Sequence, residues 1–128
     1  MTDKELLALA REARKNSYSP YSHFAVGAAL LGKSGKVYLG VNVENASFGV
    51  TNCAERTAIF SAAAAGEHDF SAIAIVGNTS VCLPCGACRQ VMAEFCDADF
   101  RIIVEDEEKK AKVTTLGELL PHSFELKG

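Results

Sequence analysis

The N-terminal stretch has the apolar pattern of an amphipathic helix. Apolar residues recur on one helical face at Leu6, Leu9, Ala10 and Ala13, with charged residues largely off that face. Thr2 and Glu5 have the spacing of a capping box. We therefore expect a packing helix from Thr2 to about Lys15, ended before Pro20 because proline disfavours helix in itself and in the residue before it.

Two apolar runs follow, around a short loop that contains glycine. They cover residues 24–31 and 37–43, and Gly32-Lys33-Ser34-Gly35 lies between them. This pattern predicts a β-hairpin. The second run ends in the polar stretch Asn42-Val43-Glu44-Asn45. This stretch is either a loop with local asparagine turns or a binding pair, since Asn42 and Glu44 lie two apart and point the same way to hydrogen-bond a polyol.

The remaining pattern alternates helices and short apolar strands. We expect helices over 54–65 and from 86 to about 96, strands over 70–76 and 100–104, a short strand near Val113 and a helical turn over 115–120. Gly66 is placed to cap the first of these helices. This order predicts an α/β protein, a three-layer α/β/α sandwich around a five-stranded mixed sheet.

One geometric consequence brings distant residues together. Across helix, strand and helix the chain reverses twice, so both helices begin at the sheet edge where the intervening strand ends. Cys53 and Cys85 precede these helices, and they can therefore be neighbours. Ligands of open α/β sheets bind outside the carboxyl ends of strands, so a functional site is expected at this edge.

Composition and charge narrow the class of protein. Nearly half of the 128 residues (48%) are apolar, which suffices for one core and predicts a single domain over residues 1–128. The net charge of −3 argues against a nucleic-acid-binding protein. The chain has no apolar run of about 18 residues, so no membrane span is expected. Its polar first residues lack a signal-peptide core, which favours the cytoplasm.

The cysteines are the strongest chemical signal. There are five, an odd and clustered set that suits a metal site or free thiols better than disulfides. Cys85 and Cys88 lie on one helical face, Cys53 can supply a third sulfur, and helix starts favour the thiolate. Three protein ligands with a fourth position open to water form a catalytic zinc arrangement, in which the pKa of the water falls to about 7.

Two charged residues accompany the first cysteine. A carboxylate at a helix start, as at Glu55, is common for electrostatic reasons alone, but beside a zinc-bound water it can carry a proton to a substrate. Three thiolates and Zn²⁺ sum to −1. Arg56 is either a surface residue or a donor to the thiolates that withdraws part of this charge, and the unfavourable helix dipole at its position favours the second reading.

The cysteine spacing also allows two other arrangements. Cys82, Cys85 and Cys88 resemble part of an iron–sulfur ligand run, but no further cysteine completes it. A non-catalytic zinc module would need a fourth ligand, for which Cys82 is the candidate. Cys96, late in a helix, is expected to be a buried small apolar residue.

Two motifs together resemble a known family. Cys-Ala-Glu-Arg-Thr-Ala at 53–58 and Pro-Cys-Gly-Ala-Cys-Arg-Gln at 84–90 resemble the zinc-dependent cytidine deaminases of the short, homotetrameric type. The stretches 21–30 and 42–45 are similar as well, so the resemblance covers nearly the whole chain. It implies a cytidine deaminase-like fold and the conversion of cytidine and 2′-deoxycytidine to uridine and 2′-deoxyuridine in pyrimidine salvage.

The resemblance also implies roles for particular residues. Cys53, Cys85 and Cys88 would hold one zinc ion per chain, and Glu55 would shuttle protons during attack on C4 of cytosine. Arg56 matches the charge-balancing position. The substrate-binding residues would be Asn42 and Glu44 at the ribose, Phe24 against the pyrimidine, the backbone N–H of Ala54 at the base, and Phe124 in a neighbouring subunit's site.

The chain departs from the family pattern at two positions. Phe48 stands where tyrosine is usual, which removes a phenolic hydrogen bond at a subunit contact. Leu83 stands where serine is frequent, although the family uses a main-chain carbonyl there. Three alternative functions stay open. A deaminase of a nucleoside antibiotic of the blasticidin type is disfavoured by the polar pair Asn42 and Glu44, and a polynucleotide-editing deaminase is disfavoured by the acidic charge. The third alternative is the non-catalytic zinc module.

Overall fold

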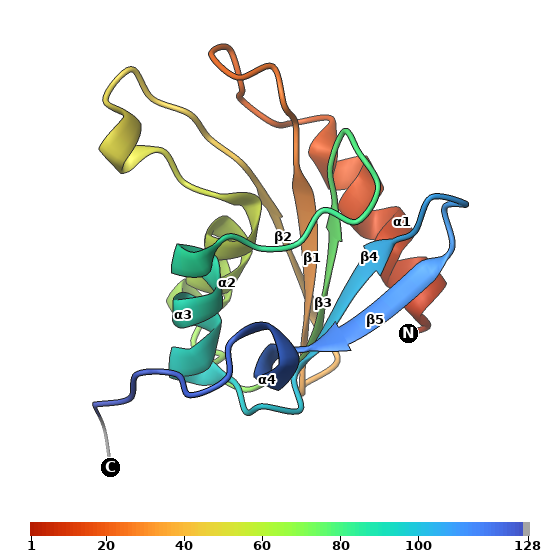
Figure 1. The fold of residues 1–128 in the computed structure, drawn as a ribbon, viewed down its shortest axis with the longest axis vertical. Helices are drawn as coiled ribbons and strands as arrows, with labels where there is room; N and C mark the ends of the chain where they lie inside the picture. The colour runs from red at the N-terminus through yellow and green to blue at the C-terminus, as the bar shows by residue number, and fades with distance from the viewer. Residues whose placement is uncertain (127–128) are drawn as a thin grey trace.

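A five-stranded mixed sheet forms the centre of the fold (Figure 1). The structure is a computed structural model and describes residues 1–126. The strands are β1 Gly27–Gly32, β2 Val37–Val41, β3 Phe70–Val76, β4 Arg101–Glu105 and β5 Ala111–Thr115, in the order β2-β1-β3-β4-β5. The neighbouring strands β3 and β4 pair in parallel, and the other three neighbouring pairs are antiparallel. The expected five-stranded mixed sheet is confirmed.

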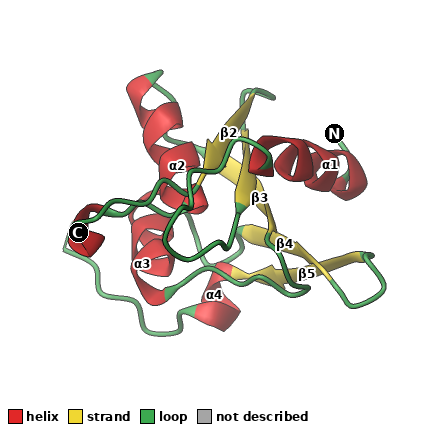
Figure 2. Cartoon of the chain, turned by 90° about the horizontal axis from the view of Figure 1, so that it is seen from above, coloured by secondary structure: helices red, strands yellow, loops and turns green. Residues whose placement is uncertain are grey.

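Helices cover both faces of the sheet (Figure 2). Helix α1 (Asp3–Arg14) lies on one face, and α2 (Ala54–Ala64) and α3 (Gly86–Phe95) lie on the other. The division follows from the alternation of side chains along each strand. Ile73 and Ile75 join the core under α2 and α3, whereas Ala72 and Ala74 pack with α1. The three-layer α/β/α arrangement is therefore confirmed.

Local signals set the helix ends. Thr2 and Glu5 form the expected capping box, in which Glu5 N–H donates to Thr2 Oγ1 at 3.1 Å and Thr2 N–H donates to Glu5 Oε1 at 2.8 Å. Gly66 has a φ of +91° just after α2, the left-handed geometry that favours glycine. The short helix α4 (Leu116–Leu119) occupies the expected helical turn. Within residues 1–126, no helix is both long and apolar enough to cross a membrane.

The first hairpin is shorter than the apolar runs predict. Strand β1 begins at Gly27 rather than Phe24, and β2 ends at Val41 rather than Val43. The reason is Asn42, whose side-chain Oδ1 accepts the Val26 N–H at 3.0 Å. The main-chain carbonyl of Asn42, which a regular ladder would offer to Val26, accepts the Tyr18 N–H at 3.0 Å instead.

Helices α2 and α3 begin at one edge of the sheet, as the double reversal predicts. Strand β3 runs between them in the sequence, and in Figure 1 its arrowhead points to the end of the molecule where α3 starts. Cys53 is the N-cap residue of α2 and Cys85 that of α3. The topology therefore places both cysteine motifs at the same sheet edge.

Helix α2 approaches the sheet closely at Gly40 of β2. A Cβ at this position would lie 2.2 Å from the Ala54 carbonyl oxygen and 2.5 Å from the Ala58 nitrogen. Both are backbone atoms, so they cannot rotate away as a side chain can. The first turns of α2, which carry the candidate site residues, therefore depend on the absence of a side chain at Gly40.

We expect Gly40→Ala to displace α2 and to lower the free energy of unfolding by about 3 kcal/mol, the upper part of the range for overpacked cores. Urea unfolding measures this change. Gly49→Ala is the matched control, because a Cβ at Gly49 would meet no atom within 4 Å. Equal stability of the two variants would show that the close approach does not constrain α2.

Candidate metal centre and active site

Three cysteine sulfurs converge at the starts of α2 and α3. The Sγ atoms of Cys53, Cys85 and Cys88 all lie within 4.8 Å of one another. The Cys53–Cys85 distance is 3.8 Å and the Cys85–Cys88 distance is 3.3 Å. Tetrahedral zinc with Zn–S bonds of about 2.3 Å requires sulfurs about 3.8 Å apart. The spacing and the all-sulfur donor set therefore fit zinc.

The electrostatics of the cluster favour a thiolate. Hydrogen bonds from Cys88 and then Arg56 lower the pKa of Cys53 to about 5, against the opposing effect of burial. The pKa of Cys88 is raised, because its thiol hydrogen-bonds to Cys53 and because it is buried. Without a metal ion, Cys53 therefore favours the thiolate and Cys88 the protonated thiol, and a bound cation would stabilise the ionised form of the ligands.

Glu55 stands in the first turn of α2 beside this cluster. It is 5% exposed and is the buried acidic side chain among the described residues. Burial raises the pKa of Glu55 to about 7, and the nearby Cys53 thiolate adds to the effect. A hydrogen bond with Cys88 acts in the opposite direction. Near neutral pH this carboxyl group can therefore both accept and release a proton, as a general acid–base group must.

Arg56 lies against the thiolates. Its Nη2 donates to Cys53 Sγ at 3.2 Å and approaches the Thr51 carbonyl at 3.5 Å. Its buried Nε has no hydrogen-bond partner within residues 1–126. The guanidinium is thus positioned to offset the negative charge that three thiolates impose on a divalent cation.

The other two cysteines lie outside the cluster. Cys82 Sγ packs near Gly77 and the Phe24 ring, and burial raises the pKa of its thiol to about 11. Burial likewise raises the pKa of Cys96 to about 12, so both remain protonated at neutral pH. Among the described residues the cluster therefore offers three sulfur atoms, without a fourth from Cys82, and a tetrahedral ion bound there would keep one open position.

The polar pair at the end of β2 faces the segment 17–26. Asn42 is largely buried, and its Nδ2 donates to the Phe24 carbonyl at 2.8 Å. Glu44 Oε1 accepts the N–H groups of Tyr21 and Ser22, each at 3.0 Å. Hydrogen bonds from Ser22, the main cause, hold the pKa of Glu44 below its ordinary value. Both side chains thus organise this segment, a role that the spacing of Asn42 and Glu44 alone did not indicate.

The other expected site residues and the two departures from the family pattern differ in burial. Ala54 is the first, fully buried residue of α2, where backbone N–H groups have no intrahelical acceptor. Phe124 is 71% exposed, and its carbonyl accepts from Gln90 Nε2 at 2.9 Å, so its ring lies on the surface beside α3. Phe48 is also exposed and meets the edge of the Tyr21 ring. Leu83 is 40% exposed in the loop before Pro84.

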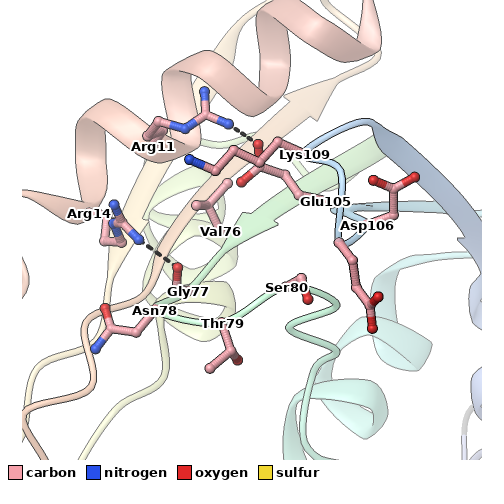
Figure 3. Close-up of a pocket in the computed structure, with 11 residues that line it drawn as sticks. Arg11, Arg14, Val76, Gly77, Asn78, Thr79, Ser80, Glu105, Asp106 and Lys109 are labelled. Atoms are coloured by element: carbon pink, nitrogen blue, oxygen red, sulfur yellow. Dashed lines mark hydrogen bonds and ion pairs between the residues drawn. The ribbon is translucent and has the colours of Figure 1, made fainter.

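A cavity of about 450 Å³ lies on the α1 side of the sheet (Figure 3). Its arginines are already engaged: Arg11 forms an ion pair with Glu105, and Arg14 Nη1 donates to the Gly77 carbonyl at 2.5 Å. None of the cluster cysteines lines it. This cavity is therefore separate from the metal centre, and Arg14 holds the loop that follows β3.

Comparison with known families agrees with this geometry. Residues 1–104 match the model of the cytidine and deoxycytidylate deaminase zinc-binding region. The chain belongs to this family. Members of similar length include a cytidine deaminase of Halalkalibacterium halodurans, which is 50% identical over 125 residues. The matched region covers 97% of this chain and 95% of that protein. The chain is therefore of the short type within the family.

Solved structures of the family have the same fold. A cytidine deaminase from Burkholderia pseudomallei has 49% sequence identity and a TM-score of 0.90, with 97% of this chain and 100% of that chain covered. A cytidine deaminase from Mycobacterium tuberculosis has 39% identity and a TM-score of 0.85, with coverage of 98% and 99%. The cytidine deaminase-like fold expected from the sequence is confirmed, and the zinc-binding family agrees with the three-cysteine centre.

We expect one zinc ion per chain in the purified protein and loss of that ion in Cys88→Ala, since two sulfurs cannot hold zinc as three do. Elemental analysis of the dialysed protein measures the metal content. Cys96→Ala, outside the cluster, should retain the full zinc content. Full zinc content in Cys88→Ala would show that the ion is held elsewhere.

Proposed function

We propose that this protein deaminates cytidine to uridine, and 2′-deoxycytidine to 2′-deoxyuridine, with water as co-substrate and ammonia as product. The observation that carries the proposal is the buried carboxyl group of Glu55 beside three metal-ligating sulfurs. The cytidine deaminases that resemble the chain, at 50% and 49% identity, support the choice of cytidine.

A zinc ion held by Cys53, Cys85 and Cys88 would supply Lewis acidity and would lower the pKa of a water molecule to about 7. Glu55 takes a proton from this water and donates it to N3 of the base as oxygen adds to C4. Glu55 then moves the second proton of the water from the new C4 hydroxyl to the exocyclic amino group, so that the C4–N bond breaks, ammonia leaves and the C4 carbonyl forms. The pKa of Glu55, raised to about 7 chiefly by burial, suits both transfers.

Arg56 and the start of α2 complete the reaction centre. Donation from Arg56 to Cys53 Sγ, at 3.2 Å, draws electron density from a ligand sulfur and so preserves Lewis acidity. The N–H of Ala54, free at the helix start, binds the carbonyl of the pyrimidine. The Phe24 ring packs on the base, and an aromatic contact of this kind contributes about 1–3 kcal/mol to base binding.

Asn42 and Glu44 already make several hydrogen bonds, and their unused donor and acceptor positions are those that can bind the sugar. Asn42 Oδ1 accepts from the Val26 N–H and the Ser17 hydroxyl, and Asn42 Nδ2 donates one hydrogen to the Phe24 carbonyl. One Nδ2 hydrogen remains, because a side-chain amide carries two. Glu44 Oε1 accepts two N–H groups and Oε2 one hydroxyl, which leaves one acceptor position on Oε2. A single sugar hydroxyl can therefore accept from Asn42 and donate to Glu44.

The alternative functions are not favoured. A non-catalytic zinc module would need a closed site, but Cys82 lies outside the metal cluster. The relatives are cytidine deaminases, which does not favour a deaminase of a nucleoside antibiotic. A substrate embedded in a nucleic acid would require a basic groove, whereas the chain carries a net charge of −3.

The active unit is proposed to be a cytoplasmic homotetramer of pyrimidine salvage, with active sites near subunit interfaces. Large apolar side chains remain on the surface of one chain, among them Phe48 at 75% and Phe124 at 71% exposure. Phe48 also lines a cavity of about 320 Å³ with Tyr21 and Glu44. Burial of these rings by neighbouring chains would let Phe124 reach a second subunit's site.

Glu55→Gln should keep its zinc and lose cytidine turnover by about 10³-fold, within the range for removal of a general acid–base group. The loss of cytosine absorbance measures turnover. Glu107→Gln, an exposed residue on the β4–β5 turn, should retain full activity as the matched control. Turnover by zinc-loaded Glu55→Gln at the parent rate would contradict the proton-transfer role, and an inactive zinc-loaded parent would contradict the proposed function.

Light scattering after gel filtration should give a particle four times the 13.6 kDa mass of one chain. Phe48→Asp should shift the particle to smaller species, because a buried unpaired charge is costly at an interface. Lys112→Asp, an exposed change on β5, should leave the particle mass unaltered. A monomeric parent would remove Phe124 from the set of substrate contacts.

A further inference from the structure

The main chain of Phe24 is held on both sides by polar side chains. Its N–H donates to Ser22 Oγ at 3.0 Å, and its carbonyl accepts from Asn42 Nδ2 at 2.8 Å. No regular strand supports this residue, since β1 begins only at Gly27. The position of the Phe24 backbone therefore depends on these two side chains.

Each of the two holding residues is itself held by a further residue. The Ser22 hydroxyl donates to the Glu44 carboxylate. Asn42 Oδ1 accepts from Val26 N–H at 3.0 Å and from the Ser17 hydroxyl. Ser17 follows the end of α1, is half-buried, and also lies 3.2 Å from Ser19 Oγ. The chain of contacts thus runs from Ser17 through Asn42 to the Phe24 carbonyl.

The Phe24 ring has little room behind it. A Cβ on Gly77 would lie 3.0 Å from Phe24 Cε1 and 2.7 Å from Cys82 Sγ. Gly77 is fixed in turn, because its carbonyl accepts from Arg14. Because Gly77 limits movement of the ring on this side, the distance between the ring and a bound base depends on the position of the Phe24 backbone.

We propose that Ser17 is a positioning residue for catalysis, which acts through the Asn42 amide on the placement of the Phe24 ring. The proposal rests on the proposed function, in which Phe24 packs on the pyrimidine. Ser17 contacts Asn42 only at oxygen atoms, not at the Nδ2 group assigned to the sugar. Its hydroxyl keeps Oδ1 turned toward Val26 and thereby keeps Nδ2 on the Phe24 carbonyl. One amide plane then orients both the base-stacking ring and the donor to the sugar.

A double-mutant cycle in kcat/KM for cytidine tests this chain of contacts. Ser17→Ala should lower kcat/KM about fivefold, the effect of one neutral hydrogen bond. In a Phe24→Ala background the same change should have almost no further effect, since there is no ring left to place. Ser17→Thr, which keeps the hydroxyl, should restore most of the activity.

Ser34→Ala is the matched control, because Ser34 also donates its hydroxyl to a loop partner, Glu67, at 2.6 Å. It lies in the β1–β2 turn, at the end of the hairpin opposite Asn42, and should leave kcat/KM unchanged. The thermal midpoint of each variant reports folding separately. If Ser17→Ala does not fold, the nearly isosteric Ser17→Cys takes its place in the cycle.

Two results would overturn the role of Ser17 while the parent remains active on cytidine. The first is an unchanged kcat/KM in folded Ser17→Ala. The second is a loss of the same size in the Phe24→Ala background, which would mean that Ser17 supports the fold or the sugar contact alone. A zinc-loaded parent without activity on cytidine would instead overturn the proposed function and this inference together.

Discussion

The close contact between α2 and β2 is the constraint on which the site depends. At Gly40 the helix backbone lies so near the strand that a single Cβ would overlap the Ala54 carbonyl. This contact sets the height of the first turn of α2 above the sheet edge. Cys53, Glu55 and Arg56 all belong to that turn or its cap, so one backbone contact constrains the positions of the proposed metal ligand, proton carrier and charge-balancing group.

The same packing sets the chemistry of Glu55. Helix starts are electropositive and would favour an ionised carboxylate, but Glu55 is buried and its pKa rises to about 7. The effect of desolvation on the pKa of Glu55 is therefore larger than the effect of the helix start. The pKa of Cys53 moves in the other direction and falls to about 5, because hydrogen bonds from Cys88 and then Arg56 outweigh the effect of burial. Two neighbouring residues with opposite shifts can serve as proton carrier and metal ligand, respectively.

The segment 17–26 adds a second layer of organisation. It has little regular structure, yet Asn42 and Glu44 bind its backbone at several points. These side chains were expected to face a polyol, and they also take the place of a strand partner for Phe24 and Val26. The proposed sugar contacts and the proposed base-stacking ring are thereby joined in one hydrogen-bond network, in which Ser17 is the outermost member.

Local signals in the sequence predicted the elements, the three clustered cysteines and the family. The Thr2–Glu5 spacing, the apolar periodicity and the Cys-x-x-Cys pair act over a few residues, so pattern alone reveals them. The double reversal around β3 was enough to bring Cys53 to Cys85. Only the tertiary structure decided the burial of Glu55, the close approach at Gly40 and the internal bonds of Asn42. These depend on side-chain directions and packing distances between segments far apart in the chain, which no local pattern encodes.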